Sequence, residues 1–153
     1  MPYFRGKRAV ITGAGSGIGR ALALRLAAEG CELHLSDIDA GGLAGTTELL
    51  PGKALCHTSI VDVADAAAVG NWSAAIAAQA DHVDLVVNNA GVGLIGDAAE
   101  TSLEDFHWLM DINFWGVVHG CRFFLPLLDA SPRGHLVNIS SIFGIAGVRT
   151  QSA

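Results

Sequence analysis

The sequence predicts an α/β fold in which a doubly wound parallel sheet lies between two layers of helices. Short runs of β-branched and aliphatic residues alternate along the chain with longer stretches rich in alanine and leucine. The short runs are apolar on both faces, which is typical of parallel strands covered by helices on both sides. A glycine-rich turn follows the first of these runs. Together these features indicate a three-layer α/β/α arrangement.

The expected strands are Arg8–Thr12, Glu32–Asp37, Ala54–Thr58, Val83–Asn88 and His135–Ser140. The expected helices between them are Ile18–Glu29, Gly41–Leu50, Ala64–Ala80 and Leu103–Leu128. In the first helix, apolar residues recur one turn apart, and Gly30 follows as a C-terminal cap. No repeat, low-complexity tract or linker interrupts the pattern, so residues 1–153 are expected to form a single domain.

The last expected helix has unusual features. Thr101 and Glu104 form a candidate capping box at its start, and Pro126 is expected to close or kink it. Its middle is apolar on nearly every side, so the helix is expected to be covered all round. Gly116 and Gly120 would allow another backbone to approach closely, either within the molecule or in a neighbouring subunit.

Composition limits the classes of function. The chain has 153 residues, a net charge of −6 and only 16% charged residues, which argues against nucleic acid as a partner. No apolar run approaches the roughly 20 residues of a membrane-spanning helix. The three cysteines are widely spaced and fit reduced thiols in a soluble cytoplasmic protein. The six histidines show no metal-binding spacing, so no metal site is expected.

The glycine-rich turn "VITGAGSGIGR" (Val10–Arg20) carries the strongest chemical signal. It follows a strand and opens a helix, where backbone N–H groups and the helix dipole can hold a pyrophosphate. Its spacing is Gly13-x-x-x-Gly17-x-Gly19, because a G-x-G-x-x-G pattern starting at Gly13 would reach Ile18. The turn predicts a Rossmann-like dinucleotide site, although a tight turn without any ligand can also use glycine.

Asp37 strengthens the prediction of a dinucleotide site. It ends the second strand, where a carboxylate can accept hydrogen bonds from the hydroxyls of an adenosine ribose and would repel a 2′-phosphate. Neither Ser16 nor Ile38 supplies a cation for such a phosphate. NAD is therefore expected rather than NADP. The alternative for Asp37 is a solvated strand end or a helix cap, and Asp39 is the better candidate for that cap.

Five motifs in order resemble the short-chain dehydrogenase/reductase family across essentially the whole chain. They are Thr12-Gly-x-x-x-Gly-Ile-Gly19, Asp62-Val63, Asn88-Asn-Ala-Gly91, Asn113-x-x-Gly116 and "VNISS" ending at Ser141. The resemblance implies an oxidoreductase that transfers hydride between a nicotinamide cofactor and an alcohol or ketone, assembled as a homodimer or homotetramer. It implies a cofactor-binding set made of Gly13, Ser16, Gly17, Ile18, Gly19, Asp37, Asp62, Val63, Asn89, Ala90 and Gly91. Asp62 would bind the adenine amino group or, alternatively, cap a helix before Ala64.

On the catalytic side, the resemblance assigns a hydrogen bond to the substrate oxygen to Ser141 and a bound water in a proton relay to Asn113. The alternative for Asn113 is an amide satisfied by backbone. The family's Tyr-x-x-x-Lys motif would begin directly after Ala153, and the only tyrosine present is Tyr3. The chain is therefore expected to be inactive alone, to lack the C-terminal completion of its domain and to leave the edge of its fifth strand exposed.

Two other functions stay open on the sequence alone. One is a nucleotide-binding or regulatory module without catalysis. The other is a different doubly wound enzyme, such as a methyltransferase that uses S-adenosylmethionine. The methyltransferase would also have an acidic residue after its second strand, but it does not require the Asn88–Gly91, Asn113 and Ser141 series.

Overall fold

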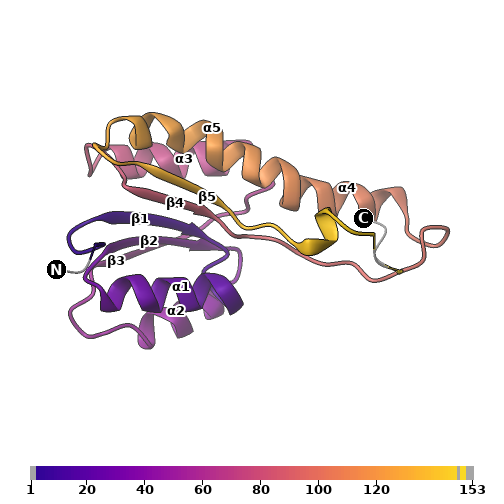
Figure 1. The fold of residues 1–153 in the computed structure, drawn as a ribbon, viewed down its shortest axis with the longest axis horizontal. Helices are drawn as coiled ribbons and strands as arrows, with labels where there is room; N and C mark the ends of the chain where they lie inside the picture. The colour runs from indigo at the N-terminus through magenta and orange to yellow at the C-terminus, as the bar shows by residue number, and fades with distance from the viewer. Residues whose placement is uncertain (1–2, 148, 151–153) are drawn as a thin grey trace.

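The computed structural model describes residues 3–147 and 149–150 and contains a five-stranded sheet in which all neighbouring strands are parallel (Figure 1). The strands are β1 (Arg8–Thr12), β2 (Glu32–Asp37), β3 (Cys56–Ile60), β4 (Leu85–Asn88) and β5 (His135–Asn138), in the spatial order β3-β2-β1-β4-β5. The chain therefore builds outward from β1 on one side and then crosses to the other side with β4. This is the predicted Rossmann-like α/β fold.

Helices cover both faces of the sheet. Helices α1 (Gly17–Ala28) and α2 (Ala40–Glu48) lie on one face in Figure 1. Helices α3 (Ala66–Ala77), α4 (Leu103–Met110) and α5 (Gly116–Asp129) lie on the other, with the π-helical segment η1 (Asp111–Trp115) joining α4 to α5. The predicted three layers are therefore present.

Two apolar cores separate the layers, because successive strand residues point to opposite faces. Ala9 and Ile11 of β1 are fully buried in the core shared with α1 and α2. Val10, between them, is buried in the core under α3 and α5. In that second core, the rings of Trp72 and Phe124 meet edge to face with centroids 5.1 Å apart. The uninterrupted apolar run of β1 thus serves both cores.

Several predicted boundaries differ from the structure by one to three residues, and pairing and capping explain two of them. We expected a strand at 54–58, but β3 starts at Cys56, which pairs with Leu33, and continues to Ile60. The N–H of Ala54 is instead used in a turn with the carbonyl of Pro51, 2.8 Å away. We expected the third helix to begin at residue 64, but it begins two residues later because the Asp65 side chain caps it, accepting from the N–H groups of residues 67 and 68.

The predicted capping residue of the last helix was wrong by one position, although the helix starts at Leu103 as expected. Ser102, and not Thr101, is the N-cap, and it accepts from the N–H of Asp105 at 3.0 Å while donating to the same residue's carboxylate at 2.7 Å. Glu104 therefore takes no part in the capping pair. Pro126 lies inside α5 and does not end it. The helix begins where predicted, but its middle is a π-helical turn.

The expectation that this helix is covered all round is also wrong for the chain described. Trp108, Phe114 and Trp115 are 45–50% exposed, so one apolar face is open. Its glycines serve internal packing instead. A Cβ on Gly116 would lie 2.8 Å from Cγ2 of Val63, and one on Gly120 would overlap the Asn88 side chain. The internal alternative for these two glycines is therefore the one observed.

Strand β5 lies at one edge of the sheet and pairs only with β4 among the described residues. All four of its residues are exposed, which agrees with the expected open edge. Its first residue, His135, is hydrogen-bonded through Nε2 to the Tyr3 hydroxyl at 2.9 Å. Within residues 3–147 and 149–150, no helix is long and apolar enough to cross a membrane.

Candidate cofactor-binding site

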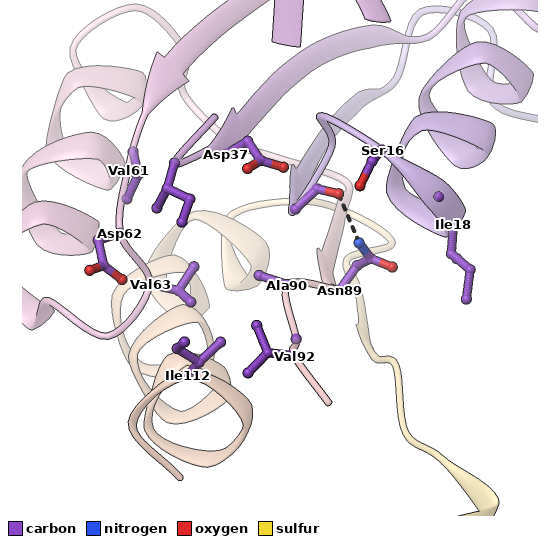
Figure 2. A pocket seen from close by; sticks show the side chains of 14 residues that line it. Ser16, Ile18, Asp37, Val61, Asp62, Val63, Asn89, Ala90, Val92 and Ile112 are labelled. Atoms are coloured by element: carbon purple, nitrogen blue, oxygen red, sulfur yellow. Dashed lines mark hydrogen bonds between the residues drawn. The ribbon is translucent and has the colours of Figure 1, made fainter. Parts of the chain in front are cut away.

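A cleft of about 350 Å³ opens at the carboxyl ends of β1 to β4, where the strand order reverses (Figure 2). Its lining is Gly13, Ser16, Gly17, Ile18, Asp37, Ile38, Val61, Asp62, Val63, Asn89, Ala90, Gly91, Val92 and Ile112. Ten of the eleven sequence-predicted cofactor residues are in this set, and Gly19 is the exception. Residues from four strand ends and from η1 are thus brought together.

Glycine is required in the turn after β1 for two different reasons. Gly13 has φ +65°, and a Cβ there would lie 2.8 Å from Cα of Ala90. Gly17 has φ +48°, and a Cβ there would meet no atom within 4 Å. Gly13 therefore allows β1 and β4 to approach closely, whereas Gly17 leaves free space at the start of α1, where the first N–H groups of a helix lack intrahelical partners.

Gly19 lies in the first turn of α1 and packs behind the cleft. A Cβ at this position would overlap the carbonyl oxygen of Gly13 and lie 2.6 Å from Nδ2 of Asn89. The missing side chain lets the first turn of α1 rest directly on the end of β1. Gly19 therefore shapes the turn without lining the cleft.

The turn is held in place from the β2 side. The Asp37 carboxylate accepts from the N–H of Gly15 at 2.8 Å and from the N–H of Asp39 at 3.0 Å. The guanidinium of Arg20 donates to the carbonyl of Gly15, and its Nε donates to the Thr46 hydroxyl at 2.9 Å. Asp39 is the N-cap of α2, as predicted, although its side chain makes no capping hydrogen bond. The turn is therefore ordered by the protein's own contacts.

The segment after β4 is tied to β1 in the same way. The Thr12 hydroxyl accepts from the N–H groups of Asn89 and Ala90, both at 3.0 Å. The Asn89 amide donates to the carbonyls of Thr12 at 3.0 Å and Gly13 at 3.1 Å, the latter dashed in Figure 2. The side chain of Asn89 therefore acts as a clamp between the two turns that form the floor of the cleft.

The far side of the cleft is largely apolar. Figure 2 shows Val63, Val92 and Ile112 facing the space below Asp37 and Ala90. Asp62 borders this side and accepts from the N–H of Ala64 at 2.9 Å, so part of its carboxylate is already used in a local turn. This contact does not cap α3, which begins at a later residue. A flat apolar ring placed on this side of the cleft would meet a polar acceptor only at its edge, where Asp62 lies.

The two predicted catalytic residues do not line the cleft. Asn113 is exposed on η1, where its Oδ1 accepts from the N–H of Val92 at 2.8 Å and its Nδ2 donates to the Val92 carbonyl at 2.8 Å. These contacts match the alternative in which the Asn113 amide is hydrogen-bonded to backbone. Among the described residues, one N–H and one acceptor lone pair of the amide are still free to bind another group. Ser141 is exposed and caps a short 3-10 helix by accepting from the N–H of Phe143 at 3.2 Å.

Four lining residues were not among the predicted site residues: Ile38, Val61, Val92 and Ile112. Ile38 and Val92 directly follow predicted positions at strand ends, so adjacency was an available signal. Ile112 comes from a helix far along the chain, and its only signal in the sequence is that it precedes the predicted catalytic residue Asn113. An apolar side chain on a mostly apolar helix carries no site signal by itself.

An open parallel sheet with a glycine turn and a strand-end carboxylate at its switch point defines a nucleotide-binding α/β protein. The family model described as "short chain dehydrogenase" matches residues 7–153. The chain therefore belongs to the short-chain dehydrogenase family, in agreement with the resemblance seen in its motifs.

Several relatives extend this comparison. "Putative oxidoreductase SadH" of Mycobacterium tuberculosis is 47% identical over 154 residues, which cover 100% of this chain and 56% of that protein. A short chain dehydrogenase/reductase from Burkholderia phymatum, solved in complex with NAD, is 40% identical with a TM-score of 0.92, over 99% of this chain and 54% of that one. A metagenomic short-chain oxidoreductase solved in complex with NADP is 29% identical with a TM-score of 0.90, over 97% and 68%. The chain spans about half the length of the curated relatives SadH and 1-deoxy-11-beta-hydroxypentalenate dehydrogenase of Streptomyces avermitilis.

Proposed function

We propose that this chain forms the cofactor-binding part of an NAD-dependent dehydrogenase that interconverts an alcohol and a ketone. The observation that carries the proposal is the position of Asp37 at the end of β2, in the cleft and beside the glycine turn. No lysine or arginine lines this cleft within the described part of the chain. The relative from Burkholderia phymatum, which binds NAD, supports the same cofactor class.

The glycine turn fits the pyrophosphate of a dinucleotide. Gly17 opens α1, and the space beside its Cα is empty, so phosphate oxygens can approach the first backbone N–H groups of the helix. The Ser16 hydroxyl borders the same space and makes no capping bond to the helix. The apolar side of the cleft suits an adenine ring, with Asp62 at its rim.

Asp37 selects between the two nicotinamide dinucleotides by charge. Its oxygens each hold one backbone N–H and keep lone pairs for the hydroxyls of a ribose. A 2′-phosphate at the same place would put negative charge beside this carboxylate. Two unit charges ~4 Å apart repel by about 1 kcal/mol in water and about 4 kcal/mol near a protein surface. We expect NADPH to bind about 10- to 100-fold more weakly than NADH.

When bound, the nicotinamide ring supplies or accepts the hydride. Negative charge then develops on the substrate oxygen as a ketone is reduced, and a hydrogen-bond donor lowers the barrier to that step. We assign this donor to the hydroxyl of Ser141. We assign Asn113 a positioning role, because its side chain fixes Val92 at the cleft wall. Tyr3, the only tyrosine in the sequence, lies at the opposite end of the sheet against His135, so we assign it no role in proton transfer.

The test is to titrate the full-length protein with NADH and with NADPH and to measure binding by the quenching of tryptophan fluorescence. Asp37→Asn keeps an acceptor for the N–H of Gly15 but removes the charge, and should bring the two affinities to within a few-fold of each other. Asp39→Asn is the matched control, because Asp39 is a neighbouring carboxylate outside the cleft and should change neither affinity. Equal binding of NADH and NADPH by the unmodified protein would contradict the assignment of Asp37.

The non-catalytic module is the alternative, and turnover decides between the two functions. Oxidation of secondary alcohols by the full-length protein with NAD, lost in Ser141→Ala, supports the enzyme. Tight NADH binding without turnover of any alcohol or ketone tested would support the module. The methyltransferase hypothesis does not survive the family assignment.

We also propose that the protein is a homodimer or homotetramer that uses the open face of the α4–η1–α5 helix. Trp108, Phe114, Trp115 and Leu125 are each 45–50% exposed along this helix, and exposed large apolar side chains that gather on one element are typical of an interface. Light scattering of the full-length protein should give a mass of two or four chains, and Trp115→Glu should lower it. A monomer at micromolar concentration would refute this proposal. The cytoplasmic location stays a prediction from composition.

A further inference from the structure

Two histidines and a glutamate gather on one face of the sheet at the edge formed by β2 and β3. Glu32 and His34 are two residues apart on β2, and His57 of β3 is the direct cross-strand partner of His34. The side chains of all three lie on the same face, because strand residues alternate in direction. They are near the amino end of β2, while Asp37 and the cleft are at its carboxyl end.

The ring nitrogens of both histidines face a single carboxylate oxygen. Nε2 of His34 lies 3.5 Å and Nε2 of His57 lies 3.8 Å from Oε1 of Glu32. The two imidazoles are stacked with centroids 4.9 Å apart and planes 15° from parallel. One ligand atom from each of the three residues can be chosen so that all lie within 4.8 Å of one another.

One of these nitrogens has no hydrogen-bond partner. His34 is only 3% exposed, and its Nε2 makes no hydrogen bond with any described residue. A buried polar atom left in this state costs roughly 1–3 kcal/mol, so such atoms call for an explanation. An ion bound by Nε2 supplies one.

We propose that Glu32, His34 and His57 bind a divalent transition-metal cation of the Zn²⁺ type, which cross-links β2 and β3. Ligand atoms about 2.0–2.1 Å from a tetrahedral zinc are separated by about 3.3 Å, which is close to the observed 3.5 and 3.8 Å between each histidine Nε2 and Glu32. Because the two imidazoles are stacked 15° from parallel, binding also requires the more exposed ring, His57, to rotate until both ring nitrogens point at the ion. Imidazole nitrogen and carboxylate oxygen are ordinary zinc ligands. His57 is half exposed, which leaves room for water as a fourth ligand.

Arg8 positions the carboxylate for this role. Its Nε donates to Oε2 of Glu32 at 2.9 Å, and Nη1 donates to the carbonyl of His82 at 3.2 Å. Oε2 is thereby occupied and Oε1 is left facing the histidines, as outer-shell partners do in metal sites. The guanidinium also places a positive charge near the ion, so we expect moderate rather than very tight affinity.

The test is calorimetric titration of Zn²⁺ into the full-length protein after removal of any tag and treatment with a chelator. One site per chain is expected. His57→Ala and Glu32→Gln should each weaken binding at this site by at least about 10-fold, since loss of an outer-shell partner alone costs about 10- to 100-fold. His107→Ala removes an exposed histidine on α4 and should leave the affinity unchanged.

A second measurement guards against variants that fold poorly. Zn²⁺ should raise the melting temperature of the unmodified protein and of His107→Ala, but not that of His57→Ala, whose metal-free melting temperature is recorded first. NADH is left out throughout, so failure of the cofactor proposal would not affect the result. If Zn²⁺ does not bind, or if it binds equally well to His57→Ala, the proposal is overturned.

Discussion

Replacement of Gly19 by alanine tests whether the glycine turn depends on direct contact between α1 and the end of β1. The added Cβ would lie 2.8 Å from the carbonyl carbon of Gly13 and 2.6 Å from Nδ2 of Asn89. Carbon atoms pack comfortably at about 3.5–4.0 Å, so the backbone must open by about 0.7 Å or more. Neither neighbour is the end of a flexible side chain, because the Asn89 amide is held by two carbonyls.

The cost follows from these contacts. Overpacking typically costs about 1–3 kcal/mol, and the displaced hydrogen bond from Asn89 to Gly13 adds about 1 kcal/mol. We therefore expect Gly19→Ala to lower the free energy of unfolding by about 2–4 kcal/mol and the melting temperature by roughly 5–15 °C. Urea unfolding and thermal melting of the full-length protein measure this directly. NADH affinity should fall in the same variant, because the turn no longer holds its shape.

Gly52→Ala is the matched control. Gly52 has no positive φ, and a Cβ there would meet nothing within 4 Å. Its melting temperature should stay within about 2 °C of the unmodified protein, as for most exposed substitutions. If Gly19→Ala melts like Gly52→Ala and binds NADH normally, the reasoning about backbone contact in the turn is refuted.

Three further predictions concern buried and positioned groups. Burial would raise the pKa of Asp84, but hydrogen bonds from the N–H of Arg8 and the Ser131 hydroxyl hold that pKa below its usual value. The ionised carboxylate therefore stabilises the fold at neutral pH, and this stabilisation is lost as the pH falls through the lowered pKa. Between pH 7 and 3, the melting temperature of Asp84→Asn should decline less steeply than that of the unmodified protein. Burial raises the pKa of Cys31 to about 12, so at pH 8 only about one Cys31 thiol in ten thousand is ionised. Iodoacetamide should therefore react with Cys31 far more slowly than it reacts with the free thiol of glutathione. Rapid labelling of Cys31 in the folded protein would contradict the observed burial. Asn113→Ala removes both hydrogen bonds to Val92 and should lower NADH affinity by about 10-fold, whereas an unchanged affinity would mean that the cleft wall holds without them.

Most of the fold could be predicted because the spacing of apolar residues and the residue composition of each segment indicate the same elements along the chain. The apolar run of β1 and the glycine turn after it specify a central parallel strand followed by a helix. The start of β3 could not be read in this way, since His57 to Ser59 carry little strand signal and the register is set by pairing with Asp37 and its neighbours. The π-helical turn at η1 was also missed, because its residues are as apolar as those of an ordinary helix.

The site was predictable where its residues are neighbours in sequence and not where strands bring them together. The cleft could be predicted because it forms at the ends of strands, and sequence motifs mark those strand ends. Glu32, His34 and His57 fit no linear metal-binding spacing, because their proximity comes from the register between β2 and β3. Asn89 had a visible motif, but its role as a clamp depends on hydrogen bonds to Thr12 and Gly13 that only the structure provides.

The double use of Asp37 has a consequence for protein engineering. Conversion of the proposed NAD site to NADP would call for a basic residue in place of this carboxylate. A basic side chain there removes the acceptor that orders the N–H of Gly15, so the proposed coenzyme preference and the stability of the turn depend on the same position. Successful conversion should therefore require a compensating substitution in the loop, for example one that restores an acceptor to Gly15.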